Sequence, residues 1–272
     1  MVSNTVSTDY REFVGKNIVI VEACYNVADS FIPTDGRNIH VGAACARLFS
    51  ERGANVTILD PSSKVLEELK AEIEVFEGEI NTIVADCADP EDLKRAAGSI
   101  QGPVNALVNC HSNPITGSLE NLDFDRLEEA VRGDLLGPLF ATKSFLPHLK
   151  KADDSSVTHI GSIDGILGNP HIPSYSMCKG GLIPLTHVMA DEFSKYGIRV
   201  NCVARAMIVD KGDPIHENYT PLVEQTPTKR PAYPKEVAEA VYFIASSVAS
   251  YINGVTLPVD GGRIGITPGT KL

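Results

Sequence analysis

Short apolar runs alternate with longer helical patterns along nearly the whole chain, and this alternation constrains the fold more than any other feature. Seven runs have the length and apolar content of a buried strand: 17–23, 55–60, 80–86, 106–109, 156–161, 199–204 and 256–259. Helical patterns lie between or after them: 41–53, 63–76, 90–100, 124–151, 174–197 and 234–250. Strands that alternate with helices form a parallel sheet with helices on both faces. The sequence therefore predicts an α/β fold, a single doubly wound domain of Rossmann type with a seven-stranded parallel sheet.

The stretch GSIDGILGNPHIPSYSMCKGGL, residues 161–182, carries the strongest chemical signal. Tyr175 and Lys179 stand four residues apart in a predicted helix, so they share one face and lie one turn apart. An ammonium beside a phenol favours the phenolate, and this suits a tyrosine to general acid or base chemistry. Ser162 ends the preceding apolar run, where a hydroxyl can hold a substrate oxygen beside the phenol. The spacing alone also fits a surface tyrosine beside a solvated lysine, so the neighbouring residues decide the interpretation.

Those neighbours closely resemble the active-site segment of the short-chain dehydrogenase/reductase family, in G-S-I-x-G-x-x-G-N-P followed by Y-S-x-x-K-G-G. The resemblance extends over roughly residues 15–263. It includes L-V-N at 107–109, R-V-N-C-V-A at 199–204 and N-G-V-T-L-P-V-D-G-G at 253–262.

The resemblance implies a role for each residue of the catalytic group. Ser162 would hold a substrate oxygen, and Tyr175 would transfer a proton while hydride moves to or from a nicotinamide. Lys179 would favour the phenolate and hold the nicotinamide ribose. The family's asparagine in N-L-x-G becomes Asp134 in D-L-L-G. In the family this asparagine anchors a water that links the lysine to solvent. Asp134 would hold that water and pair with Lys179, or it merely replaces the asparagine structurally.

The first cofactor loop departs from the family pattern T-G-x-x-x-G-x-G. The strand runs into Val21-Glu22 where Thr-Gly is expected, and the loop is about a dozen residues longer than usual. It ends in R-N-I-H-V-G, which resembles R-S-I-A-x-G of the enoyl-reductase branch, where a longer first loop still binds NAD(H). Ile39 and Gly42 would then hold the cofactor. Alternatively the phosphate cradle is lost, which Glu22 favours because a carboxylate repels a pyrophosphate.

Two carboxylates end the next strands. Asp60 stands eighteen residues after Gly42, where a carboxylate accepts from ribose hydroxyls and repels a 2′-phosphate. This favours NAD over NADP. By the resemblance, Asp86-Cys87 would lie against the adenine amine. Either aspartate is alternatively the N-cap of the helix that follows.

Two further cofactor motifs are altered. The usual N-N-A-G reads N-C-H-S at 109–112, which retains Asn109 beside the ribose but brings bulkier residues. The usual P-G-x-x-x-T reads R-A-M-I-V-D at 205–210. Asp210 stands at the position of the threonine, where a carboxylate would repel a phosphate. Arg205 would offset this repulsion by pairing with Asp210, Glu22 or a pyrophosphate oxygen.

These observations leave three functional hypotheses. The first is an NAD(H)-dependent oxidoreductase that interconverts a secondary alcohol and a ketone, or reduces a related carbonyl. The second is a non-redox enzyme of lyase, dehalogenase or isomerase type, in which Ser162 and Tyr175 do acid–base chemistry beside a degraded cofactor site. The third is a catalytically idle binding protein, against which the retained Ser162, Tyr175 and Lys179 argue.

Chain length and net charge limit the domain organisation and the classes of partner. The chain of 272 residues suits one domain, 15–272, after an N-terminal extension, 1–14, and by the resemblance 205–233 forms a lid over a small-molecule substrate. A net charge of −11 argues against nucleic-acid and anionic-membrane partners. Six scattered cysteines and no signal or membrane segment predict buried thiols and a cytoplasmic protein. The histidine spacing predicts no metal site, and the family implies a homodimer or homotetramer.

Overall fold

A parallel sheet forms the centre of the molecule. The structure, a computed structural model, describes residues 12–22, 41–215 and 217–266. Within them, seven strands lie in the order β3-β2-β1-β4-β5-β6-β7, and each neighbouring pair is parallel. The strands are β1 (Asn17–Val21), β2 (Asn55–Asp60), β3 (Ile80–Val84), β4 (Ala106–Asn109), β5 (Ser155–Ser162), β6 (Ile198–Arg205) and β7 (Thr256–Val259). The predicted Rossmann-type fold is confirmed.

The order of the strands reverses beside β1. The chain passes from β1 to β2 and β3 on one side, and then crosses to β4 on the other, with Val21 opposite Asn109 in register. In open α/β sheets, ligands bind at the carboxyl ends of the strands around such a reversal. The fold therefore directs attention to the residues that follow β1 and β4.

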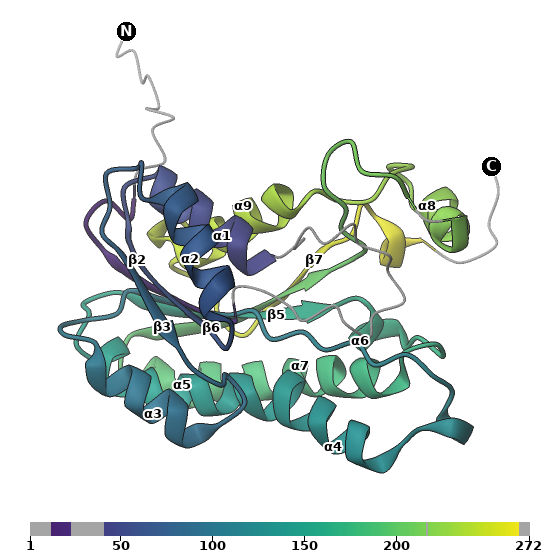
Figure 1. Cartoon of the computed structure of the whole chain (residues 1–272), viewed down its shortest axis with the longest axis horizontal. Coiled ribbons are helices and arrows are strands. Elements are labelled where there is room, and N and C mark those ends of the chain that lie inside the picture. Colours follow the sequence, from purple (N-terminus) through teal and green to yellow (C-terminus); the bar gives the residue numbers. More distant parts are fainter. Residues whose placement is uncertain (1–11, 23–40, 216, 267–272) are drawn as a thin grey trace, which may run out of the picture.

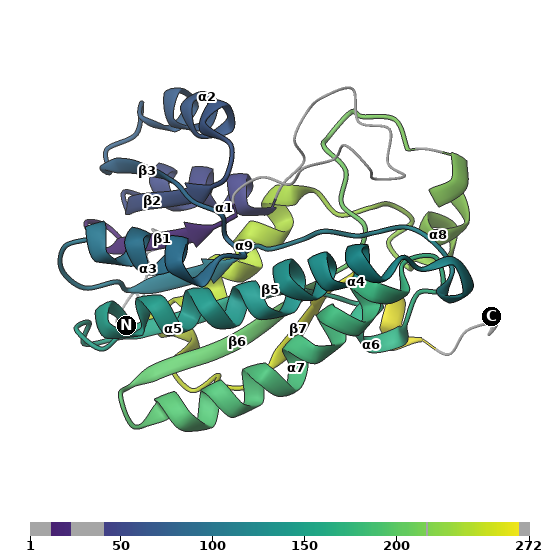
Figure 2. The same cartoon turned by 60° about the horizontal axis from the view of Figure 1, so that its bottom comes forward.

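Helices cover both faces of the sheet (Figures 1 and 2). One face packs against α1 (Val41–Glu51), α2 (Ser63–Ile73) and α9 (Pro234–Ala245), and the other against α3 (Pro90–Ser99), α5 (Gly137–Leu149) and α7 (Pro173–Ser194). Strand β1 shows why, because Ile18 and Ile20 pack toward the first group while Val19 and Val21 pack toward the second. Because both faces of β1 are covered, four consecutive apolar residues follow Asn17 in this strand.

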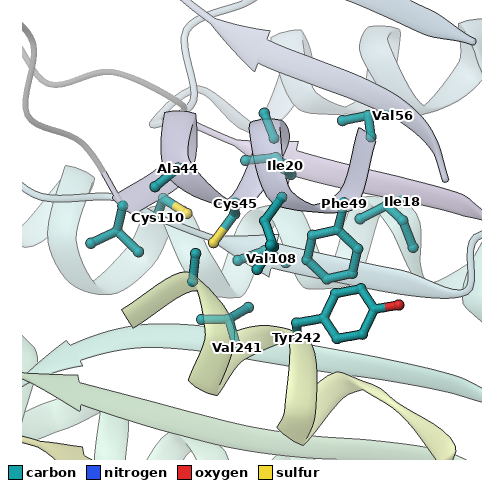
Figure 3. Close-up of a cluster of buried hydrophobic side chains, with 14 of the residues drawn as sticks. Ile18, Ile20, Ala44, Cys45, Phe49, Val56, Val108, Cys110, Val241 and Tyr242 are labelled. Carbon is teal, nitrogen blue, oxygen red and sulfur yellow. The ribbon is translucent and has the colours of Figure 1, made fainter. Parts of the chain in front are cut away.

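Aromatic rings close the first of these two cores. Phe49 of α1 and Tyr242 of α9 lie with ring centroids 5.0 Å apart (Figure 3). Phe13 packs edge-on against both rings at 5.1 Å. The packed domain therefore begins at or before Phe13, within the segment predicted as the N-terminal extension.

The predicted single helix over 124–151 is wrong in its middle. It consists of α4 (Phe124–Val131), a π-helical turn η2 (Arg132–Leu136) and α5. Pro138 explains the break, because it has no N–H to continue the α-helical ladder, and Gly137 instead donates to the carbonyl of Arg132. The π turn carries Asp134, and such turns are frequent at functional sites.

A short helix that the sequence did not predict, α6 (Asp164–Leu167), packs closely on α7. A Cβ at Gly165 would lie 2.5 Å from the carbonyl carbon of Lys179, so only glycine permits this approach. The contact holds the segment after Ser162 beside the turn of α7 that carries Lys179.

The predicted lid, 205–233, includes a further short helix, α8 (Thr220–Gln225). The lengthened first loop, with Ile39, lies outside the described residues, as does Cys24. The described cysteines are free and buried: Cys45, Cys87, Cys110, Cys178 and Cys202. Among the described helices, none combines the length and apolarity needed to cross a membrane.

Candidate active site

Tyr175 and Lys179 lie in the first turns of α7. The helix starts at Pro173, where the missing N–H of proline costs no hydrogen bond. Both side chains are buried, and Lys179 Nζ lies 5.4 Å from the centroid of the Tyr175 ring. The ammonium and the phenol therefore share one buried space, as their spacing predicts.

Lys179 is held from three sides. Its Nζ lies 3.4 Å from Asp134 Oδ1 and donates to the carbonyl of Ile160 at 3.1 Å and to the carbonyl of His111. Burial by itself lowers the pKa of Lys179, but the Asp134 carboxylate and the Tyr175 phenol outweigh it and raise the pKa above the ordinary value. Lys179 is therefore an ammonium at neutral pH, fixed in place.

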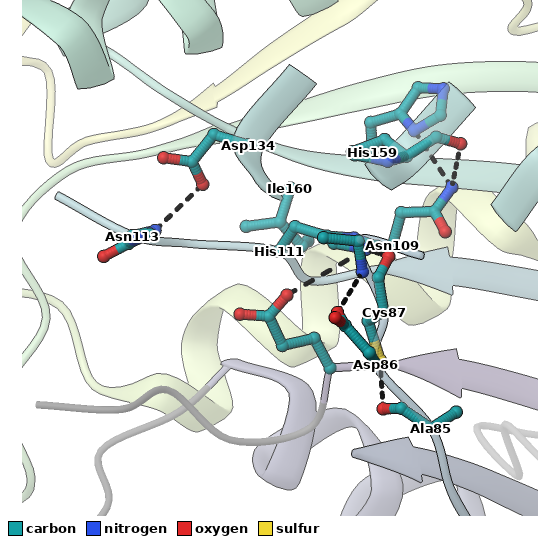
Figure 4. Close-up of polar contacts among 12 residues, drawn as sticks. Ala85, Asp86, Cys87, Asn109, His111, Asn113, Asp134, His159 and Ile160 are labelled. Atoms are coloured by element: carbon teal, nitrogen blue, oxygen red, sulfur yellow. Dashed lines mark hydrogen bonds and ion pairs between the residues drawn. The ribbon is translucent and has the colours of Figure 1, made fainter. Parts of the chain in front are cut away.

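Asp134 is fully buried on the π turn η2. Its Oδ1 accepts from the backbone N–H of Asn113 at 2.9 Å (Figure 4), while its Oδ2 has no hydrogen-bond partner among the described residues. Burial raises the pKa of Asp134, and the nearby Lys179 ammonium opposes that rise. The carboxylate contacts Lys179 directly, so the pair needs no bridging water.

Ser162 and Arg205 end the neighbouring strands β5 and β6 and are partners in register. Ser162 Oγ donates to Asp164 Oδ2 at 3.3 Å and accepts from the Asp164 backbone N–H at 3.1 Å. Arg205 Nη2 donates to Tyr175 Oη at 3.3 Å, a contact that the sequence did not predict. The sequence signal for this contact was that Arg205 stands where the family pattern has a proline. The fold thus brings a hydroxyl, a phenol and a guanidinium to one edge of the sheet.

Asn109 and His159 form a buried polar pair behind this group. Asn109 Nδ2 lies 3.1 Å from His159 Nδ1 and donates to Thr142 Oγ1 at 3.1 Å (Figure 4). Burial, with Lys179 nearby, lowers the pKa of His159 to about 4, so the ring is neutral. Asn109 Oδ1 has no partner among the described residues.

His111, one of the bulkier residues of N-C-H-S, is fully buried. Its Nε2 lies 2.8 Å from the carbonyl of Cys87, which only accepts, so Nε2 carries the proton (Figure 4). Gly137 makes room for the ring, since a Cβ there would lie 2.5 Å from His111 Cδ2. Burial lowers the pKa of His111 to about 3 and keeps it neutral.

The predicted adenosine-binding residues lie at the ends of β2 and β3. Asp60 is buried, and its Oδ1 accepts from the backbone N–H of Ser62 at 2.9 Å. Ser62, not Asp60, caps α2. Asp86 is exposed and accepts from the Ala88 N–H at 2.8 Å, while the cap of α3 is Asp89. Neither aspartate is therefore the helix cap that was the alternative.

Cys87 and Gly42 are buried as well. The Cys87 thiol donates to the carbonyl of Ala85 at 3.6 Å, and burial raises its pKa well above the ordinary value. Gly42 lies in the first turn of α1, at the end of the sheet where the cofactor is expected. The fold thus places these two residues and the aspartates at one edge.

Glu22 follows β1 directly and has φ +60°, the left-handed region that favours glycine. Its backbone N–H donates to the carbonyl of Leu59 at 2.9 Å, and its Oε2 lies 3.9 Å from His111 Nε2. Burial, together with the Asp134 carboxylate, raises the pKa of Glu22 to about 8. The sequence marked Glu22 as a departure from the family but not as a site residue.

A cavity of about 210 Å³ is lined mainly by residues of the predicted lid, among them Ala206, Met207, Leu222 and Arg230, and by Arg263 after β7. None of Ser162, Tyr175 and Lys179 lines it. Among the described residues, no group of three or more histidine, cysteine, aspartate or glutamate side chains is placed to hold a metal ion.

Comparison with known proteins places this geometry in a family. A family model described as enoyl-(acyl carrier protein) reductase matches residues 39–263. The chain belongs to the short-chain dehydrogenase/reductase family. Its members are oxidoreductases, dehydrogenases and reductases that use nicotinamide cofactors.

Relatives of known activity match over most of their length. A cis-4-hydroxycyclohexanecarboxylate dehydrogenase of Sinomonas cyclohexanicum is 33% identical over 82% of this chain and 91% of its own. A 3-oxoacyl-(acyl-carrier-protein) reductase of Thermotoga maritima is 28% identical over 82% of this chain and 93% of its own. The structure of levodione reductase superposes with a TM-score of 0.81 at 24% identity, over 94% of this chain and 100% of that one. At this identity, the match to levodione reductase shows that the two chains share a fold.

Proposed function

We propose that this protein is an NAD(H)-dependent oxidoreductase that interconverts a secondary alcohol and a ketone, or reduces a related carbonyl, of a small molecule. The observation that carries the proposal is the buried ion pair between Lys179 and Asp134, which lies against the Tyr175 ring while Ser162 ends the neighbouring strand. A buried ammonium is costly to maintain, and its place beside a phenol fits proton-transfer chemistry.

The described residues fit a nicotinamide dinucleotide at its ribose end. Asn109 Oδ1 at the end of β4, and His111 Nδ1 and Ser112 Oγ just after it, are buried without hydrogen-bond partners among the described residues, which suits a polar ligand. The Asp60 carboxylate suits ribose hydroxyls and repels a 2′-phosphate, so we propose NAD over NADP. The residues that would hold the cofactor are Ile39, Gly42, Asp60, Asp86, Cys87, Asn109, Tyr175 and Lys179. When bound, the nicotinamide supplies the hydride acceptor or donor.

The chain's own side chains handle the oxygen and its proton. Ser162 Oγ orients the substrate oxygen, and Tyr175 Oη gives it a proton or takes one from it. Lys179 stays charged beside the phenol because Asp134 and two backbone carbonyls hold its ammonium. Positioning by buried partners keeps these groups ready for reaction.

A non-redox activity of lyase, dehalogenase or isomerase type is the second candidate. Glu22 favours it, because its carboxyl group lies at the end of β1, where the family approaches the cofactor with a glycine-rich turn. In that case Ser162 and Tyr175 act alone on the substrate.

We also propose a cytoplasmic homodimer or homotetramer. Of the apolar residues on α7, Leu182 and Met189 belong to the core, whereas Met177 and Val188 are exposed by 52% and 60%. Those two side chains suit a helix-to-helix interface between copies of the chain.

Titration of the purified protein with NADH and NADPH, followed by calorimetry, tests the proposal. Micromolar binding of NADH with much weaker binding of NADPH is expected. Tyr175→Phe should abolish turnover of an alcohol and ketone panel while NADH binding persists, and Tyr251→Phe, at an exposed tyrosine, should change neither. No binding of either nucleotide at millimolar concentration would reject the redox function and favour the second candidate.

A further inference from the structure

Glu22 lies at the carboxyl end of β1, at the point where the strand order of the sheet reverses. It follows β1 directly, between Leu59 of β2, whose carbonyl its N–H binds, and Cys110 after β4, whose N–H binds the carbonyl of Val21. Its left-handed backbone, φ +60°, costs a non-glycine residue about 1 kcal/mol. The side chain is held in this place at the expense of local strain.

The groups that face the Glu22 carboxyl group come from every element packed around it. They are Asp60 at the end of β2, Cys87 after β3, Cys110 and His111 after β4, Asp134 on η2 and Lys179 on α7. The backbone N–H of Ser112 donates to the carboxyl group.

Among the described residues, no cation pairs with Glu22 alone. His111, at 3.9 Å, is neutral because burial lowers its pKa to about 3, against the opposing effect of its hydrogen bond to the carbonyl of Cys87. Lys179 is the ammonium in the group, and its charge is balanced by Asp134 at 3.4 Å. With 20% of its side chain exposed, Glu22 gains little from water, and a second carboxylate, Asp60, lies nearby. A carboxyl group in such a place keeps its proton at neutral pH.

We propose that Glu22 is a cofactor-binding residue and that the nicotinamide dinucleotide binds only to the form of the protein in which Glu22 is protonated. This inference rests on the proposed function. The pyrophosphate of the dinucleotide carries two negative charges, and an ionised Glu22 at the same edge of the sheet would repel it. The neutral acid removes that repulsion and offers one O–H donor.

The proposal couples binding to the uptake of a proton. The pKa of Glu22, about 8, lies within the range where NADH is stable. If the ionised form does not bind, the apparent Kd rises about tenfold between pH 7 and pH 9. At pH 8 each molecule of NADH should bring about half a proton onto the protein.

Calorimetric titration with NADH tests this in the full chain, at several pH values and at pH 8 in both HEPES and Tris. The two buffers differ in ionisation enthalpy, so the difference in heat counts the protons taken up. Glu22→Gln mimics the neutral acid, and Glu68→Gln removes a carboxylate from an exposed face of α2 as a control. Between pH 7 and pH 9, wild type and Glu68→Gln should lose about tenfold in affinity for NADH. At pH 8, each should take up about half a proton when NADH binds. Glu22→Gln should bind with an unchanged Kd across the range and take up none.

Three results distinguish a failure of the inference about Glu22 from a failure of the proposed function. Binding by wild type that does not depend on pH, or a pH dependence retained in Glu22→Gln, overturns the role of Glu22 and leaves the proposed function intact. If Glu22→Gln fails to fold, the proton count of wild type alone decides, and a count of zero overturns the inference. No binding of NADH by any variant at any pH rejects the proposed function and the inference with it.

Discussion

Replacing Glu22 with glutamine should stabilise the protein at neutral pH even without a cofactor. The pKa of Glu22 is about 8 in the folded protein and near 4.5 in an unfolded chain. Between these values the folded state holds a proton that the unfolded chain has lost, so stability falls as the pH rises from 4.5 to 8. Glutamine has no such proton to hold. Glu22→Gln should therefore exceed wild type by about 3 kcal/mol at pH 7 and about 1 kcal/mol at pH 5.

Urea unfolding of wild type and Glu22→Gln, followed by circular dichroism at pH 5, 6, 7 and 8, measures this difference. Glu68→Gln on the surface of α2 serves as the control and should follow wild type at every pH. The stability difference should grow steadily with pH. A glutamine variant that is no more stable than wild type at pH 7 would refute the reasoning, because Glu22 would then be ionised at little cost.

Three further substitutions probe other parts of the site. Asp134→Ala leaves the Lys179 ammonium buried without its carboxylate and should cost about 3–5 kcal/mol in urea unfolding; a loss below about 1 kcal/mol would contradict a tight pair. Gly165→Ala forces a Cβ against the backbone of α7 and should cost about 1–3 kcal/mol, whereas Gly98→Ala, with open space around it, should cost nothing. Asp60→Asn removes the charge that opposes a 2′-phosphate, so NADPH affinity relative to NADH should rise about tenfold in the same calorimetric titration.

The fold was predictable because its signal is local and repeated. Each strand contains a short apolar run that packs into the cores on the two faces of the sheet, and this pattern is visible without any tertiary information. The helix predicted over 124–151 failed only at η2, where Pro138 removes one donor from the ladder. A helical pattern in side chains does not show such a change in backbone hydrogen bonding.

The candidate catalytic side chains were proposed from spacing and resemblance, but their contacts could not be predicted in that way. The four-residue interval between Tyr175 and Lys179 predicts that they share a helix face. The contact of Arg205 with the Tyr175 phenol depends on the pairing of β5 with β6 and on the place of α7 over that edge. No local pattern encodes it.

The sequence alone thus predicted the strands, most helices and the family, and it proposed the residues of the catalytic group, because periodicity, spacing and motif are properties of the chain itself. Only the tertiary structure decided which buried side chains are charged. Lys179 is balanced by Asp134, and His111 is kept neutral by burial. Among the described groups around Glu22, the one ammonium, Lys179, is already paired with Asp134. Burial and the distance between charges set protonation, and both arise only when distant segments pack together.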